Sequence, residues 1–269
     1  MIGSSSPTPR DFPVAILTPM KTPISNGLTS AAASSRGKAL TMVTAGCVDG
    51  IDHVQNPHPR CPIAILADTS GSMAGTPIMD LGRGLTQFYA ELAADDLAAL
   101  RAEPMTIGFG GTVQEIVPFG PAVALAKDQP MNLTASGDTP LGRAVVHAIT
   151  AIDARCRAYA QANLAKSYSP WVVILSDGEP TDLGWEQAAH KLRQRAERDK
   201  WNVLCVAIGE NADIANLQKF SRLPVKRLEG LKFAEFFVWL SRSFQRVSHS
   251  STATTKLSLP PTSEWEANT

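Results

Sequence analysis

Three short, continuously apolar runs recur along the chain, and each is followed by polar residues and then by a helical pattern. The runs are residues 62–67, 171–176 and 202–208. An apolar run of this length without polar alternation is typical of a strand buried on both faces of a parallel sheet. Parallel neighbours need a crossover connection, which is usually a helix. The alternation therefore predicts a doubly wound α/β fold with a mostly parallel central sheet and helices on both faces.

Three stripes of apolar residues at three- and four-residue spacing predict the amphipathic helices of this fold. The stripes are Ile78, Leu81, Leu85, Phe88 and Leu92; Leu141, Val145, Ile149, Ile152 and Cys156; and Phe236, Phe237, Leu240, Phe244 and Val247. Shorter patterns predict a charged helix over 184–200, a short helix over 213–221 and a short strand over 225–228. Strands and helices thus alternate through most of the chain.

One pair of strands departs from the parallel pattern. Residues 105–109 and 113–119 flank Gly110-Gly111, which favours an antiparallel hairpin at one edge of the sheet. Thr76-Pro77 and Thr139-Pro140 are each typical of a helix start, with threonine as the cap and proline in the first turn.

Composition divides the chain into three segments. Residues 1–60 are rich in Ser, Thr, Pro and Gly and have little periodicity, so we expect a mostly disordered N-terminal extension. Two apolar pieces within it, 14–17 and 40–48, are each long enough for a short strand. An alternative is that part of this segment is not translated. Residues 61–247 form the folded domain, and residues 248–269 predict a disordered C-terminal tail.

Charge excludes several classes of partner. The chain of 269 residues has 25 Lys plus Arg and 25 Asp plus Glu, a net charge of zero. This balance argues against nucleic acid and against a polybasic membrane contact, which both need a basic excess. No apolar run approaches the ~18 residues of a membrane span, and the N-terminus lacks the order of a signal peptide. We therefore expect a cytoplasmic protein that binds neither nucleic acid nor membrane.

The four cysteines support the same compartment. Cys47, Cys61, Cys156 and Cys205 are far apart, and no C-x-x-C pair occurs. A structural zinc site needs close-set ligand pairs, so the spacing argues against one. Buried, reduced thiols in the cytosol are the simpler interpretation.

Oxygen ligands gather where the predicted strands end. The first run ends in Asp68, followed by Ser70 and Ser72, and the run at 171–176 is followed by Asp177. Thr139 precedes a predicted helix between them. The carboxyl ends of parallel strands meet at one edge, where doubly wound sheets bind ligands. Carboxylates and hydroxyls are the hard ligands that Mg²⁺ prefers, and Mg²⁺ commonly keeps waters or takes a ligand from its partner.

Each of these pieces alone has a simpler interpretation. Asp68 with Ser70 is compatible with a strand-end turn, Thr139 with a helix cap, and Asp177-Gly178 with an ordinary turn. Glu179 and Asp182 follow Asp177 and have two interpretations: they modulate the charge of the site, or they favour the dipole of the next helix. The joint occurrence of the first three at predicted strand ends favours a metal site.

The motif Asp68-x-Ser70-x-Ser72, followed by Thr139 and Asp177, resembles the metal-ion-dependent adhesion site (MIDAS) of von Willebrand factor A (VWA) domains. The resemblance implies that these five residues surround one divalent ion, Mg²⁺ or Mn²⁺, directly or through water. It also implies that an acidic residue of a partner protein fills the open position of the metal, and that the protein is not an enzyme. All five positions of the motif are present.

A narrower resemblance covers roughly residues 61–247. Segments 66–73, 137–142, 175–182 and 236–241 are similar to bacterial VWA proteins of the TerY type, from tellurium-resistance operons. Such proteins are associated with a protein kinase and a PP2C-like phosphatase, which implies a scaffold in a phosphorylation-linked stress response. Some relatives carry a cysteine-rich module that this chain lacks.

Other functions remain as alternatives. Within the same fold, an alternative is the VWA partner of an AAA-type ATPase, as in chelatase-like systems, where the metal would again bind a carboxylate of the partner. A Mg²⁺-dependent phosphoesterase of the haloacid-dehalogenase type would have a second aspartate where Ser70 stands. A serine hydrolase needs G-x-S-x-G, whereas Gly71 directly precedes Ser72. A dinucleotide motif needs a third glycine after Gly108 and Gly110, followed by a helix.

Overall fold

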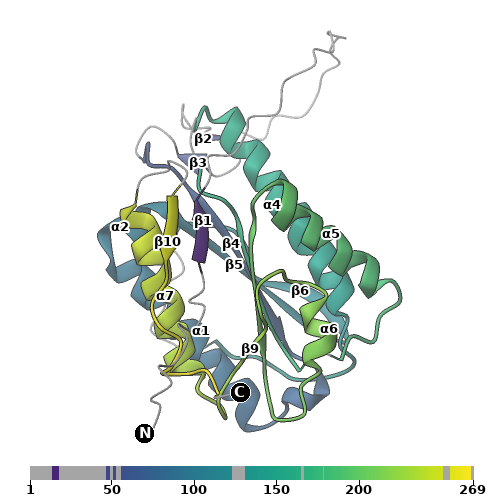
Figure 1. Cartoon of the computed structure of the whole chain (residues 1–269). Coiled ribbons are helices and arrows are strands. Elements are labelled where there is room, and N and C mark those ends of the chain that lie inside the picture. The colour runs from purple at the N-terminus through teal and green to yellow at the C-terminus, as the bar shows by residue number, and fades with distance from the viewer. Residues whose placement is uncertain are drawn as a thin grey trace, which may run out of the picture.

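The structure is a computed structural model built around one six-stranded sheet (Figure 1). It describes residues 14–17, 47–48, 51–52, 56–122, 131–164, 167–177, 179–250 and 255–267. The strands of the sheet are β4 (Cys61–Asp68), β5 (Ala102–Gly110), β6 (Thr112–Val117), β7 (Trp171–Ser176), β8 (Asn202–Ala207) and β9 (Lys226–Arg227). The helices are the 3-10 turn η1 (Gly71–Met73), α1 (Thr76–Ala94), α2 (Asp96–Arg101), α4 (Leu141–Gln161), α5 (Trp185–Arg198), α6 (Ile214–Gln218) and α7 (Phe233–His249).

The sheet has the order β6-β5-β4-β7-β8-β9, and only β6 is antiparallel to its neighbour. The chain leaves β4 toward β5 and β6, then returns to β7 on the other side of β4. The strand order therefore reverses between β4 and β7, the type of switch point where doubly wound sheets bind ligands. The predicted fold class, including the edge hairpin around Gly110-Gly111, is confirmed.

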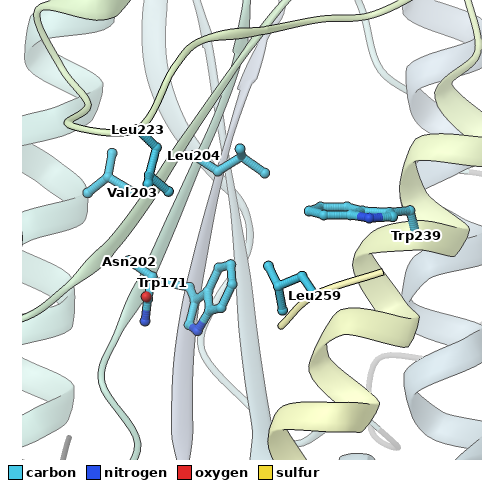
Figure 2. A pocket seen from close by; sticks show the side chains of 7 residues that line it. All are labelled: Trp171, Asn202, Val203, Leu204, Leu223, Trp239 and Leu259. Atoms are coloured by element: carbon cyan, nitrogen blue, oxygen red, sulfur yellow. The ribbon is translucent and has the colours of Figure 1, made fainter. Parts of the chain in front are cut away.

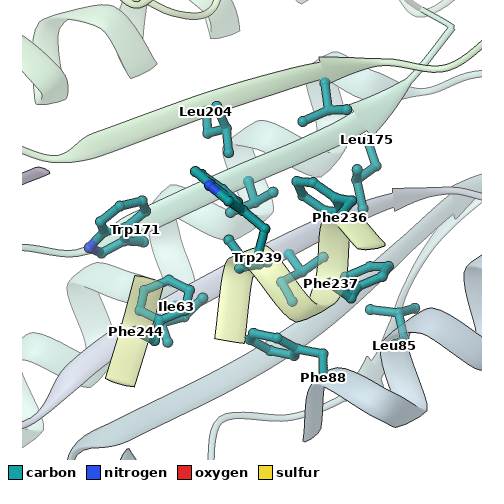
Figure 3. Packing of buried hydrophobic residues seen from close by; sticks show 14 of the residues in the cluster. Ile63, Leu85, Phe88, Trp171, Leu175, Leu204, Phe236, Phe237, Trp239 and Phe244 are labelled. Atoms are coloured by element: carbon teal, nitrogen blue, oxygen red, sulfur yellow. The ribbon is translucent and has the colours of Figure 1, made fainter. Parts of the chain in front are cut away.

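One face of the sheet is covered by α1, α2 and α7. Phe237 of α7 lies 5.9 Å from Phe88 of α1 between ring centroids, and Phe244 packs edge-on against Trp171 of β7 at 4.9 Å (Figure 3). A Cβ at Gly84 of α1 would lie 2.4 Å from the Phe237 ring, so glycine permits this close helix pair. Every residue of the first and third predicted stripes is buried here.

The opposite face is covered by α4, α5 and α6. Leu141, Val145 and Ile152 of the second predicted stripe are fully buried, while Ile149 and Cys156 are partly buried against the same cluster. A cavity of about 10 Å³ lies among Trp171, Leu204, Trp239 and Leu259 and three neighbours (Figure 2). This cavity has room for one water molecule at most.

The helix starts differ from the sequence prediction by one residue. Gly75, with a φ of 88°, caps α1, and Pro140 caps α4, so neither Thr76 nor Thr139 caps a helix through its side chain. Thr139 is therefore not committed to capping. A helix that the sequence analysis did not predict, α2, is capped by Asp95, whose side chain accepts bonds from two backbone N–H groups.

The prediction of a disordered C-terminal tail is wrong for residues 255–267. Strand β10 (Thr255–Ser258) pairs antiparallel with β1 (Val14–Leu17), one of the two N-terminal pieces expected to add a strand. Leu259 and Trp265 are buried, and Trp265 packs edge-on against Phe236 of α7 at 5.0 Å. Average polarity concealed these two apolar residues, which stand six positions apart and both reach α7.

Other predictions about the chain ends lie mostly outside the described residues. Within 1–55, the structure describes β1 and the short hairpin of β2 (Cys47–Val48) and β3 (Ile51–Asp52). The side chain of Cys47 is not among those described. Cys61 and Cys205 are buried and Cys156 is half-buried, and burial raises the pKa of the Cys156 thiol to about 12. None of the helices in the described part is long and apolar enough to cross a membrane.

Candidate metal centre

The two predicted carboxylate ligands stand at the ends of neighbouring strands. Asp68 is the last residue of β4, and Asp177 directly follows β7. The two strands pair in parallel at the switch point, with Ala67 opposite Leu175. Continued by one residue, this register places Ser176 opposite Asp68 and Asp177 one position further on, so both aspartates reach the same edge of the sheet. Asp68 is completely buried, whereas Asp177 is half-buried.

A chain of hydrogen bonds joins the two carboxylates. The backbone N–H of Ser70 donates to Oδ1 of Asp68 at 2.9 Å, and the Ser70 and Ser72 hydroxyls are bonded at 2.9 Å. The Ser72 hydroxyl then donates to Oδ2 of Asp177 at 2.7 Å. Four of the five predicted ligands therefore share one network. The turn η1, which begins at Gly71, places the two serines one after the other on the same side of the edge.

Thr139, the fifth predicted ligand, lies in a loop tied to the first one by backbone bonds. Gly71 N–H donates to the Gly137 carbonyl at 2.9 Å, and Ser136 N–H donates to the Thr69 carbonyl at 2.8 Å. Gly137 has a φ of 69°, and a Cβ there would meet Gly111 at 2.6 Å, so glycine is needed for this approach. Thr139 itself is buried, and its loop lies beside the one that contains Ser70 and Ser72.

The sequence analysis missed how the loop after Asp177 is attached. Thr139 N–H donates to the Thr181 hydroxyl at 3.0 Å, and Thr181 N–H donates to the Thr139 carbonyl at 3.0 Å. Asp182 accepts the N–H groups of Gly142 and Arg143 at 3.0 and 2.7 Å, which caps α4. The sequence analysis considered Asp182 only in relation to the metal site and the next helix, α5, and did not predict this contact with α4. Its carboxylate caps the preceding helix and joins the Thr139 and Asp177 loops.

Ser176 is a second residue that the sequence analysis missed. Its hydroxyl donates to Oδ2 of Asp68 at 2.7 Å, so this buried carboxylate accepts two hydrogen bonds. The available signal was a hydroxyl at the last position of an otherwise apolar strand. His147 of α4 bonds to Glu115 of β6 at 2.6 Å and lies outside this network.

The electrostatics of the site call for a cation. Burial raises the pKa of the Asp68 carboxyl, the hydrogen bonds from Ser70 and Ser176 oppose this shift, and the charge of Asp177 adds to it. Among the described residues, no Lys, Arg or His side chain forms an ion pair with Asp68 or Asp177. A buried carboxylate is costly unless its charge is offset.

The donor set fits a hard divalent ion bound incompletely by protein. In the described part of the chain, no group of three or more His, Cys, Asp or Glu residues is placed to hold a metal. The five candidate ligands instead offer two carboxylates and three hydroxyls, a hard oxygen set of the kind that suits Mg²⁺ or Mn²⁺. The residues present therefore fit such an ion with open positions.

No protein-family model matches the sequence, and no curated protein matches it. Solved structures do. The pilus adhesin SpaC from Lactobacillus rhamnosus GG, in its open conformation, matches with a TM-score of 0.54 and 12% identity, over 71% of this chain and 30% of that chain. Proximal thread matrix protein 1 from the mussel byssus matches at 0.51 and 16%, over 69% and 48%. A von Willebrand factor type A from Catenulispora acidiphila matches at 0.48 and 20%, over 70% and 43%.

At these low sequence identities, the comparisons show similarity of fold alone. The chain has the doubly wound α/β fold of von Willebrand factor A domains. It spans less than half the length of each of the three solved structures. The mussel protein has also been solved with zinc occupying its MIDAS motif.

Proposed function

We propose that this chain binds one divalent metal ion, Mg²⁺ or Mn²⁺, through Asp68, Ser70, Ser72, Thr139 and Asp177, and that the bound ion in turn binds a carboxylate of a partner protein. The observation that carries the proposal is the fully buried Asp68, bonded through two serines to Asp177, with no ion pair to either carboxylate among the described residues. The VWA fold and the zinc-occupied MIDAS of the mussel protein support the same assignment.

The incompleteness of the ligand set is the basis of partner binding. Five side chains of which three are neutral hydroxyls leave positions of the ion to water or to an incoming oxygen. A carboxylate is the natural occupant because it adds charge to a site with only two. We propose a binding function and no enzymatic one, because Ser70 occupies the position where a phosphoesterase of similar design needs its acid–base aspartate.

We further propose a TerY-type role: a cytoplasmic bacterial scaffold that joins a protein kinase and a PP2C-like phosphatase in tellurium resistance or a related stress response. The similarity of segments 66–73, 137–142, 175–182 and 236–241 to that subfamily supports this. The alternative, a VWA partner of an AAA-type ATPase, uses the same metal site. The TerY-like segment in α7 favours the first.

Metal binding is tested by calorimetric titration of the chain with MgCl₂ and MnCl₂. We expect one site in the wild type, and no detectable site in Asp68→Ala. The matched control is Asp96→Asn, which removes an exposed carboxylate from α2 and should leave the titration unchanged. Equal titration curves for the wild type and Asp68→Ala would refute the assignment.

Partner binding is tested by a pull-down in Mg²⁺ and in EDTA, followed by identification of the retained proteins. We expect a kinase or phosphatase to be retained by the wild type in Mg²⁺ only, and by Asp68→Ala in neither condition. Equal retention in EDTA would contradict binding through the metal. Steady Mg²⁺-dependent release of phosphate from a generic ester, abolished by Asp68→Asn, would favour the phosphoesterase alternative.

A further inference from the structure

Exposed apolar side chains gather at the edge of the sheet that carries the candidate metal centre. The described part of the chain has five large, strongly exposed apolar residues: Met79, Leu100, Val146, Leu183 and Leu231. Three of the five, Met79, Leu183 and Leu231, follow the carboxyl ends of β4, β7 and β9. All three connections of this type emerge at the same edge of a parallel sheet.

Leu183 is the most exposed of them, because its side chain is completely in solvent. Its two neighbours are fixed. Asp182 accepts the N–H groups of Gly142 and Arg143, and Gly184, with a φ of 80°, begins the bonding of α5. A leucine between two anchored residues has little freedom to fold back onto the domain. The loop that follows Asp177 therefore holds an apolar side chain out into water beside the metal edge.

Met79 and Leu231 extend this surface on the other helical layer. Met79 is 53% exposed in the first turn of α1, and helical side chains lean toward the N-terminal end, which here is the metal edge. Leu231 is 38% exposed in the connection from β9 to α7. Single exposed apolar residues are ordinary, but Met79 and Leu183 follow β4 and β7, the two strands that end at the candidate ligands, and Leu231 lies at the same edge after β9.

The charges at this edge restrict the partner further. Asp138, next to Thr139, and Glu179, two residues after Asp177, are both exposed. Arg143, which is exposed and bonds to the Gly111 carbonyl, adds one basic side chain at this edge. Together with the two carboxylates of the site, Asp138 and Glu179 still make the rim acidic on balance. A partner segment with several acidic residues would be repelled by this rim, whereas one carboxylate is attracted by the ion.

We infer that the metal edge is a docking face for a partner segment in which a single Asp or Glu is flanked by apolar residues, with Leu183 as the main apolar contact. This inference rests on the proposed function, because the acid is bound through the metal. It adds the partner's chemistry: one carboxylate for the ion, and apolar side chains or an apolar pocket for Leu183. Truncating a central, desolvated contact commonly weakens an interface about tenfold.

The test is selection from a displayed library of random peptides of about 12 residues on the full chain in Mg²⁺, with elution by EDTA. We expect enriched peptides to share one Asp or Glu with apolar residues close to it in sequence. Peptides selected on Leu183→Ser should still contain the acidic residue but should no longer be enriched in apolar neighbours. A peptide selected on the wild type should bind Leu183→Ser about tenfold more weakly. The matched control, Leu100→Ser, alters an exposed leucine at the end of α2, away from the metal edge, and should not change binding.

Calorimetry with Mg²⁺ alone separates the possible outcomes. Leu183→Ser should bind the ion as the wild type does. Enrichment of an acidic residue with random or acidic neighbours would overturn the inference and leave the proposed function intact. Equal peptide affinity of Leu183→Ser and the wild type would do the same. If no peptide is eluted specifically by EDTA although the ion binds, both the inference and the carboxylate-binding function are wrong.

Discussion

The parallel strands bury one carboxylate at their amino ends and another at their carboxyl ends, but the charges of the two carboxylates are offset differently. At the start of β5, Glu103 is 2% exposed and bonds to Nε of Arg60 at 3.1 Å, to Nε of Arg155 at 2.6 Å and to the Tyr159 hydroxyl at 2.6 Å. At the end of β4, Asp68 is equally buried, and its bonds come from two serines.

The difference shows what a structural carboxylate looks like in this fold. Where the charge of Glu103 serves stability, the chain supplies two arginines to offset it. Among the described residues, nothing cationic is supplied to Asp68, although the same sheet shows that arginines can be placed at such depth. The counter-charge at the Asp68 edge is therefore expected from solution, in the form of a metal ion.

The largest effect is expected at the arginine-paired edge. Glu103→Ala leaves Arg60 and Arg155, with side chains only 5% and 10% exposed, without their shared partner. Breaking a buried pair in this way costs about 3–5 kcal/mol of the free energy of unfolding. Urea denaturation should show this loss equally in Mg²⁺ and in EDTA. A loss under about 1 kcal/mol would mean that the two edges differ less than their contacts suggest.

At the metal edge, the expected effect depends on the ion. Wild type should gain about 2.7 kcal/mol of unfolding free energy when free Mg²⁺ exceeds its dissociation constant a hundredfold. Asp68→Asn should lose that gain entirely. In EDTA, however, it should unfold within about 1 kcal/mol of wild type, because the charge it removes is already disfavoured by burial. If Asp68→Asn in EDTA were as unstable as Glu103→Ala, Asp68 would be a structural carboxylate too.

Sequence separation explains how much of this site could be predicted. Asp68, Ser70 and Ser72 are neighbours in sequence at a strand end, and Asp177 follows from the rule that parallel strands end at one edge. Ser176 could not be predicted in its role because its partner, Asp68, lies 108 positions away. Spacing carries no information about a contact that only the paired strands create.

The fold was predicted on the same terms. Continuous apolar runs predicted the central strands, which are buried on both faces, and apolar stripes predicted the helices, because burial on one face imposes the helical period. The segment 255–267 has no such period. Leu259 and Trp265 are buried in the same core cluster as α7, and Trp265 packs against Phe236 and Trp239, so local composition indicated disorder where tertiary packing imposes order.

A smaller effect is expected from removing the Asp182 carboxylate, which acts as a clamp between the Thr139 and Asp177 loops. Asp182→Ala removes two hydrogen bonds at the start of α4 and should cost about 1 kcal/mol of unfolding free energy in EDTA. Since it also loosens the loops that carry two candidate ligands, Mg²⁺ affinity should fall severalfold. Asp182→Asn, which retains one acceptor, should recover part of the affinity. Unchanged affinity in Asp182→Ala would show that the ligands are placed without this clamp.

The smallest effect on stability is expected for Leu183→Ser, and this result sharpens the comparison most. The side chain is completely exposed and lies outside the three core clusters, so the free energy of unfolding should change by less than about 0.5 kcal/mol in Mg²⁺ and in EDTA. At the Glu103 edge, charged side chains form buried ion pairs that stabilise the fold. A leucine held in water at the Asp68 edge contributes nothing comparable, so a loss of peptide binding in Leu183→Ser would come from the docking face itself. A measured loss above about 1 kcal/mol would instead place Leu183 in the packing of the domain.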